Sequence, residues 1–196
     1  MPDPDKVECL LARVGWQRVD WQRPTLCMQP GMEIDFGGIG KEYAADRAAT
    51  AMAAAGAVHA VVYLGGDVRV VGSRPDGSAW RVAVQDPRGR PGVTIAHMEV
   101  TQGAMATSGD YERYFDEDGK RFHHIIDPKT GDSARKCRSV TIISGTAVRT
   151  DALTKSVFIM GPEAGIEFIN TLPDVDAVAV APDGKVYYSK GLAPPG

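Results

Sequence analysis

The pattern of apolar and polar positions predicts a short helix at the start of the chain and a longer one after a turn. Residues 5–13 carry apolar side chains at helical spacing and are followed by Gly15, which favours the end of a helix. A strand is expected next, before the turn at residues 29–31. Residues 42–55 are rich in alanine and are closed by Gly56, a composition typical of a helix with a glycine stop.

The middle of the chain reads as strands separated by tight turns. Residues 58–64 are β-branched and apolar, and residues 68–71 repeat that character after Gly65-Gly66-Asp67. These three residues are interpreted as a hairpin turn. After a turn at residues 75–77, residues 80–85 alternate between apolar and polar side chains, as a half-buried strand requires.

The remaining elements continue the mixture of strands and helices. In order, they are a strand at residues 139–144, helices at 151–160 and 162–172, a hairpin at 177–181 and 185–189, and a frayed tail at 194–196. No linker or low-complexity tract interrupts them. A chain of 196 residues with 43% hydrophobic content can bury one full core, so residues 1–196 are expected to form a single domain.

Charge and composition exclude several classes of partner. The formal net charge of −3 and a pI near 5.8 provide no basic surface for nucleic acid. No apolar run approaches the roughly 20 residues that span a bilayer, and the first residues lack the order of a secretory signal, so a soluble, unexported chain is expected. Cys9, Cys27 and Cys137 are too far apart to suggest a metal motif, which predicts reduced thiols.

Two neighbouring polar segments are the first candidates for chemistry. Around Ser108 and Gly109, hydroxyl and backbone N–H groups can hold phosphate oxygens, and residues 123–131 place two histidines before an Asp-Pro turn, where one could accept a proton. A polar β-hairpin explains the same residues equally well, because residues 116–120 have a turn composition.

A glycine-rich loop and one aspartate add further candidates. Residues 37–40 open the alanine-rich helix, whose N-terminus favours a phosphate, and Lys41 adds a positive charge. The spacing fits neither a P-loop nor a dinucleotide-binding fingerprint, which disfavours ATP hydrolysis and NAD binding. Asp151 stands near the start of its predicted helix, where it would be either a capping carboxylate or a Mg²⁺ ligand.

Taken together, these motifs resemble one family, the ApbE flavin transferases, also called FAD:protein FMN transferases. The resemblance rests on the order of the motifs from about residue 31 to residue 192. They are DFGGIGK at 35–41 with Asp46-Arg47, LGGD at 64–67, ATSGDYER at 106–113, HHIIDPKTG at 123–131, TDAL at 150–153 and FIMG at 158–161.

The resemblance implies an α+β, T-fold-like single domain of strands and helices around a flavin cleft. It implies Mg²⁺-assisted cleavage of FAD at its pyrophosphate and transfer of FMN to a threonine hydroxyl of an acceptor flavoprotein, with release of AMP. The residues it implies are His124 as base and Asp127 in catalysis, Gly40, Lys41, Asp46, Gly66, Asp67, Ser108, Gly109, Tyr111 and Thr130 in cofactor binding, and the Gly40 carbonyl and Asp151 at the metal.

The chain also departs from that family's pattern. Lys155 stands where the family's metal site has a threonine, one helical turn after Asp151, and is expected to pair with Asp151 or Glu42 and to compete with Mg²⁺. The chain is expected to be truncated at its N-terminus relative to the family. A non-catalytic FAD-binding module and an FAD pyrophosphatase therefore remain as alternatives. The location is left undecided. The resemblance implies the periplasm, whereas the chain as written has no export signal and would be cytoplasmic.

Overall fold

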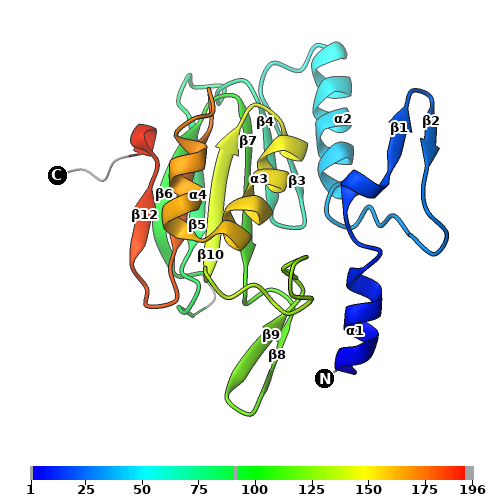
Figure 1. Ribbon diagram of the computed structural model, residues 1–196. Helices are drawn as coiled ribbons and strands as arrows, with labels where there is room; N and C mark the ends of the chain where they lie inside the picture. Colours follow the sequence, from blue (N-terminus) through cyan, green and yellow to red (C-terminus); the bar gives the residue numbers. More distant parts are fainter. Residues whose placement is uncertain (1, 91, 193–196) are drawn as a thin grey trace.

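The central feature of the computed structural model, which describes residues 2–90 and 92–192, is a six-stranded antiparallel sheet (Figure 1). Its strand order is β12-β11-β10-β7-β4-β3, and each strand pairs antiparallel with its neighbour. The strands are β3 (Ala60–Leu64), β4 (Asp67–Val71), β7 (Gly103–Gly109), β10 (Ser139–Ser144), β11 (Asp176–Val180) and β12 (Val186–Tyr188). Helices and strands therefore combine in one α+β fold, as expected.

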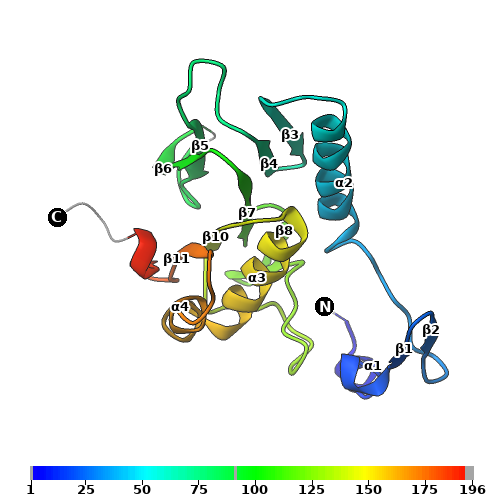
Figure 2. The same ribbon diagram turned by 90° about the horizontal axis from the view of Figure 1, so that it is seen from above.

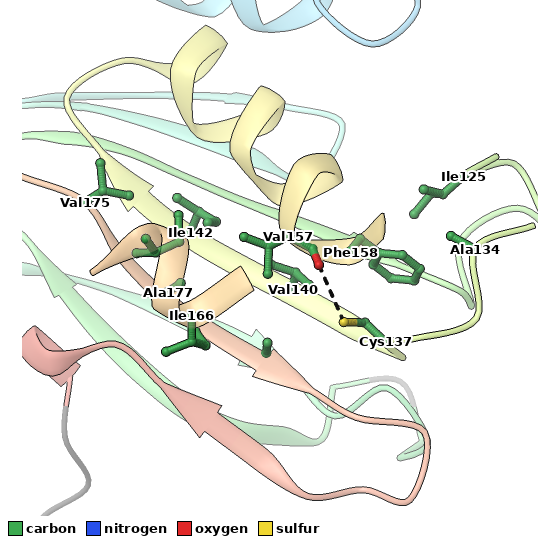
Figure 3. Packing of buried hydrophobic residues seen from close by; sticks show 12 residues of the cluster. Ile125, Ala134, Cys137, Val140, Ile142, Val157, Phe158, Ile166, Val175 and Ala177 are labelled. Carbon is green, nitrogen blue, oxygen red and sulfur yellow. Dashed lines mark hydrogen bonds between the residues drawn. The ribbon is translucent and has the colours of Figure 1, made fainter. Parts of the chain in front are cut away.

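Two helices cover one face of this sheet and close the main core. They are α3 (Ala147–Met160) and α4 (Pro162–Ile169), which lie on the same side of the sheet (Figure 2). Val157 and Phe158 of α3 are fully buried against Val140 and Ile142 of β10 (Figure 3). Burying each such side chain contributes about 1.5–3 kcal/mol, so this contact anchors α3.

A separate two-stranded ribbon covers the opposite face. It consists of β5 (Trp80–Gln85) and β6 (Thr94–Val100), paired antiparallel. Val84 and Met98 of the ribbon pack on Met105 and Val178, whose side chains point away from the helices because neighbouring strand residues alternate in direction. The sheet is thus buried on both faces near its centre.

The other elements surround this three-layer body. They are α1 (Pro4–Leu11), η1 (Trp16–Arg18), β1 (Asp20–Gln22), β2 (Thr25–Cys27), α2 (Gly40–Ala54), β8 (Tyr114–Glu117), β9 (Lys120–His123) and η2 (Lys190–Leu192). Helix α2 packs on β3, β4 and α3, whereas α1 and the β1–β2 hairpin lie apart from the sheet (Figures 1 and 2). Within the described residues, no helix has the length and apolar character needed to cross a membrane.

Most of the predicted elements are present, with three differences. Strands β6 and β7 were not predicted; β7, with the sequence GAMATSG, consists of small residues that favour strands weakly. Helix α3 begins at Ala147 rather than at residue 151, with Thr146 as its N-cap. The alternative that Asp151 caps the helix is therefore wrong, because it lies inside the helix. The predicted tail at residues 194–196 lies outside the described residues.

The N-terminus of α3 is held by a carboxylate from another helix. Asp46 of α2 accepts hydrogen bonds from the backbone N–H groups of Ala147 (2.9 Å) and Val148 (3.1 Å). It also pairs with the guanidinium of Arg69 on β4 (3.0 Å). Because an anion at a helix N-terminus satisfies free N–H groups and complements the helix dipole, Asp46 fixes where α3 begins. Its predicted part in cofactor binding stays a prediction beside this structural contact.

We expect Asp46→Ala to lower the free energy of unfolding by about 2 kcal/mol, because it removes two charge-assisted hydrogen bonds to the N-terminus of α3 and leaves Arg69 without its carboxylate partner. Urea denaturation measures the loss. Asp20→Ala, which removes an exposed aspartate of β1, is the matched control and should change stability little. Equal stability of the two variants would contradict the role of Asp46 as a cap.

Candidate functional site

A tight turn places the first acidic residue of the site. Strands β3 and β4 are joined by Gly65 and Gly66, with Leu64 paired to Asp67. Both glycines have positive φ angles, 53° and 98°, which the favoured two-residue hairpin turn requires. The hairpin interpretation of this motif is confirmed, and the turn holds Asp67 rigidly at the start of β4.

Three buried carboxylates meet beside this turn. Glu42 comes from the first turn of α2, Asp67 from β4 and Asp151 from α3, and one oxygen atom from each lies within 4.8 Å of the other two. Their exposed fractions are 2%, 4% and 4%. Oε2 of Glu42 is buried and has no hydrogen-bond partner among the described residues. Burial of an unpaired carboxylate oxygen is costly, so this atom is suited to accept a bond from a ligand.

Two lysines supply the countercharge. Lys41 donates to Asp67 and lies 2.9 Å from a carboxylate oxygen of Glu42. Lys155 donates to both carboxylate oxygens of Asp151, one helical turn before it. Of the two partners expected for Lys155, the structure therefore shows Asp151. Both lysine side chains are about one-third exposed, so solvent reaches the ammonium groups but not the carboxylates beneath them.

Burial shifts the proton affinity of the cluster. It raises the pKa of Asp67 to about 7, although the hydrogen bond from Lys41 acts in the opposite direction. Burial also raises the pKa of Asp151, again against the pull of Lys155. For Glu42, burial acts to raise the pKa, but hydrogen bonds from Asp67 and Lys41 outweigh it and the pKa is lowered. Burial thus favours a bound proton in the cluster, on Asp67 and Asp151 rather than on Glu42.

Buried hydroxyl groups fix the helix that carries Asp151. Ser108 of β7 and Thr154 of α3 share a hydrogen bond of 2.7 Å, and Ser144 and Thr150 share one of 2.6 Å. Because each pair joins the sheet to α3, the rotation of the helix is set by polar as well as apolar contacts. The side chain of Ser108, predicted to contact phosphate, is thereby engaged in positioning α3.

The two histidines of the Asp-Pro motif have different surroundings. His123 is buried, and its Nε2 lies 2.7 Å from the carbonyl oxygen of Ala134 while Nδ1 accepts from the N–H of Ile125 (3.3 Å). Since a carbonyl can only accept, Nε2 carries the proton and the ring is neutral; burial lowers its pKa. His124 is exposed, and its ring makes no hydrogen bond among the described residues. Of the pair, only His124 is free to act on a ligand.

Asp127 and Thr130 shape the turn that follows. The carboxylate of Asp127 accepts from the N–H of Lys129 (2.9 Å), and its carbonyl accepts from the N–H groups of Thr130 and Gly131. Gly131 has a φ of 71°, and a Cβ atom there would lie 2.4 Å from Val7 of α1. The turn therefore needs glycine for its backbone conformation and for the close approach of α1.

The end of β7 brings Gly109 and Tyr111 together. A Cβ atom at position 109 would lie only 2.3 Å from the ring of Tyr111, so the ring packs directly over the backbone. Burial raises the pKa of the Tyr111 hydroxyl to about 12, so this group stays protonated. Both residues thus form a fixed wall beside Ser108.

The structure joins some of the predicted site residues and separates others. Lys41, Asp67 and Asp151 share one cluster, whereas Asp46 caps α3, and no contact joins His124 to the cluster in the described part of the chain. Sequence reasoning offered Glu42 only as an alternative partner of Lys155 and not as a third carboxylate of the site, because an acidic residue in the first turn of a helix ordinarily complements the helix dipole at the surface. That Glu42 is buried beside two other carboxylates is visible only in the folded structure.

The raised pKa of Asp67 predicts how the stability of the protein depends on pH. In the unfolded chain an aspartate has a pKa near 3.8, and in the folded chain Asp67 has one of about 7. The folded state therefore binds the proton more tightly, so the stability that Asp67 contributes is full below the lower value and is lost as the pH rises through the higher one. We expect the unfolding free energy of the wild type to fall relative to that of Asp67→Asn between about pH 4 and pH 8.

Urea denaturation across that pH range measures the difference. Asp20→Asn, an exposed change of the same kind, should follow the wild type throughout. Parallel curves for the wild type and Asp67→Asn would show that Asp67 ionises normally.

These features define an α+β protein with a buried acidic site between two helices and a hairpin turn. Residues 1–179 match the family described as the ApbE family, and the chain belongs to it. It is 32% identical to a protein of Treponema pallidum and 33% identical to one of Klebsiella pneumoniae, both named FAD:protein FMN transferase. These alignments cover 98% and 96% of this chain, but only 58% and 59% of the relatives.

Solved structures of the family have the same fold. The crystal structure of the ApbE protein from Thermotoga maritima is 36% identical and matches with a TM-score of 0.88, over 98% of this chain and 63% of that one. The flavin transferase ApbE from Vibrio cholerae is 28% identical, with a TM-score of 0.86 over 99% and 63% of the two chains. The chain thus spans about three-fifths of the relatives it matches.

Proposed function

We propose that this chain contributes to an FAD:protein FMN transferase, which moves FMN from FAD to a threonine hydroxyl of an acceptor flavoprotein. The supporting observation is the buried carboxylate–lysine cluster in a chain of the ApbE family, because such a cluster suits charged phosphate chemistry. The relatives' names provide the substrates, FAD and a protein.

The reaction exchanges one phosphorus–oxygen bond for another. The threonine oxygen attacks the phosphorus of the FMN half of FAD, the bond to the bridging oxygen breaks, and AMP leaves with that oxygen. The hydroxyl proton passes to a base, for which we propose Nδ1 or Nε2 of His124. Negative charge increases on the phosphate oxygens during the attack, so nearby positive groups lower the barrier.

The start of α2 is suited to hold those oxygens. The N-cap residue, Ile39, provides no side-chain hydrogen bond to the first turn, which leaves N–H groups available, and Lys41 follows directly. The hydrogen bonds of Lys41 to Asp67 and Glu42 outweigh the effect of its burial and raise its pKa, so its charge persists at neutral pH. From the hairpin turn, Gly65 lies against the Lys41 side chain and Asp67 accepts its hydrogen bond; a contact of the cofactor with Gly66 is part of the proposal.

The donor set of the cluster also fits a divalent cation such as Mg²⁺. Carboxylate oxygens are its preferred protein ligands, and Oε2 of Glu42 is buried without a partner. Asp151 and the carbonyl of Gly40 are the proposed ligands, with Glu42 beside them; a cation there would neutralise charge on the pyrophosphate. The ammonium of Lys155 already bonds both oxygens of Asp151, so a cation has to displace it.

One observation favours a second function, a non-catalytic FAD-binding module. If Lys155 remains on Asp151, the site can bind the pyrophosphate through lysines without a metal. A titration with FAD, followed by flavin fluorescence with Mg²⁺ and then with a chelator, separates the two. Binding with AMP release and labelling of an acceptor supports the transferase, whereas binding that ignores the chelator and releases no AMP supports the module.

We expect His124→Gln to lower the rate of FMN transfer by about 10²- to 10⁴-fold, because the attacking hydroxyl loses its base, while FAD affinity stays unchanged. Covalent flavin fluorescence on the acceptor measures the rate. His97→Gln, at an exposed histidine of β6, is the control and should transfer normally. A His124→Gln variant as fast as the wild type would remove His124 from this role.

Lys155→Thr tests the competition between lysine and metal. We expect Mn²⁺, a spectroscopic substitute for Mg²⁺, to bind the variant at least about tenfold more tightly than the wild type, because the competing ammonium is gone. Electron paramagnetic resonance of free Mn²⁺ measures this without any turnover. Lys185→Thr removes an equal charge from an exposed position and should leave the affinity unchanged; equal affinities for all three proteins would contradict the competition.

A further inference from the structure

A second charged cavity lies at the far end of β7, outside the acidic cluster. It has a volume of about 170 Å³. The charged and titratable residues that line it are Arg88, Asp110, Arg121, His123, Arg135, Cys137 and Arg138. None of the carboxylates or lysines of the acidic cluster belongs to its lining. His123 lines it, whereas the proposed base, His124, does not belong to its lining.

The lining carries four guanidinium groups and one carboxylate. Arg88 binds Asp110 through two parallel hydrogen bonds of 2.7 and 2.6 Å. Arg121 lies 4.0 Å from the same carboxylate. Asp110 is itself buried, with an exposed fraction of 8%, so it holds these arginines at the cavity rather than leaving them in solvent.

Two acidic residues outside the lining neutralise two of the arginines. Asp116 pairs with Arg121 (3.0 Å), and Asp132 pairs with Arg135 (3.2 Å) as well as with Lys120 (3.3 Å). The four arginines and the three aspartates that pair with them leave at least one positive charge in excess. That excess is notable in a chain whose net charge is −3.

The excess charge belongs to Arg138. Its guanidinium makes no hydrogen bond or ion pair with any residue that the structure describes. Its backbone, by contrast, is fixed on both sides: its N–H donates to Val180 (2.7 Å), and its carbonyl accepts from the N–H of Asp110 (2.9 Å). Arg138 is half-buried, and its backbone is held by these hydrogen bonds. Its guanidinium lines the cavity together with the other arginines and is therefore suited to bind an anion.

We propose that this cavity binds a phosphate group, with Arg138 as its principal ligand and Arg88, Arg121 and Arg135 around it. Guanidinium groups match the oxygens of phosphate in paired hydrogen bonds. The volume is well below the roughly 300–1,000 Å³ of pockets that enclose a drug-sized ligand, so the cavity suits a single phosphate group and not a whole dinucleotide. The source is either free phosphate or the phosphate of a nucleotide.

Isothermal titration with inorganic phosphate, and separately with AMP, tests the site at constant ionic strength, because salt screens exposed charges. We expect saturable binding to the wild type. The dissociation constant for Arg138→Gln should be at least about tenfold higher, since one charge-assisted contact is lost. Arg81→Gln removes an exposed arginine of β5 and should bind as the wild type does. AMP, the product of the proposed reaction, can also bind at the catalytic site, so binding of AMP but not of phosphate identifies a nucleotide as the source only where Arg138→Gln weakens it.

Flavin binding distinguishes this site from the proposed catalytic one. We expect Arg138→Gln to bind FAD as the wild type does. The proposal is overturned if neither phosphate nor AMP binds, if Arg138→Gln binds them normally, or if Arg138→Gln loses FAD binding. Failure of FAD to bind at all would count against the proposed transferase and not against this cavity.

Discussion

The seating of α3 on the sheet is the contact on which the site depends. Val157 and Phe158 bury the C-terminal half of α3 against β10. Two pairs of hydroxyl groups join the helix to β7 and β10, and Asp46 fixes its first turn. These contacts differ in kind, yet each limits the rotation or the translation of the helix. Because Asp151 and Lys155 stand one turn apart on it, any shift of α3 would move both charges relative to β4 and α2.

Charge balance is the second constraint. Three carboxylates share a buried space with two ammonium groups, which leaves one negative charge unless a proton is bound. An uncompensated buried charge is unfavourable, and the raised pKa of Asp67 is the response of the protein to it. A bound proton makes the cluster neutral, and so does a divalent cation that takes the place of Lys155. The attraction of the site for a phosphate group therefore depends on whether a proton or a cation offsets the third carboxylate.

The sequence allowed much of the fold to be predicted, because most elements are regular and are bounded by glycine or proline turns. Strand β7 was not predicted, because its mostly small residues carry little strand preference. It is a strand because it pairs with β4 and β10. The start of α3 was placed four residues late because its cap comes partly from Asp46, about a hundred residues earlier in the chain. Likewise, Glu42 became visible as part of the acidic cluster only when α2, β4 and α3 were brought together.

The segment after β7 serves both charged regions of the molecule. Ser108 turns toward α3 and its acidic neighbours, whereas Asp110, two residues later, turns toward the arginines of the second cavity. Between them, Gly109 allows the ring of Tyr111 to lie on the backbone. One short stretch of chain thus contributes a contact to the helix of the acidic cluster and a contact to the arginines of the cavity. The cavity presents an arginine without a side-chain partner among the described residues, whereas at the acidic cluster Lys41, a bound proton or a cation has to offset the carboxylates before phosphate oxygens can approach.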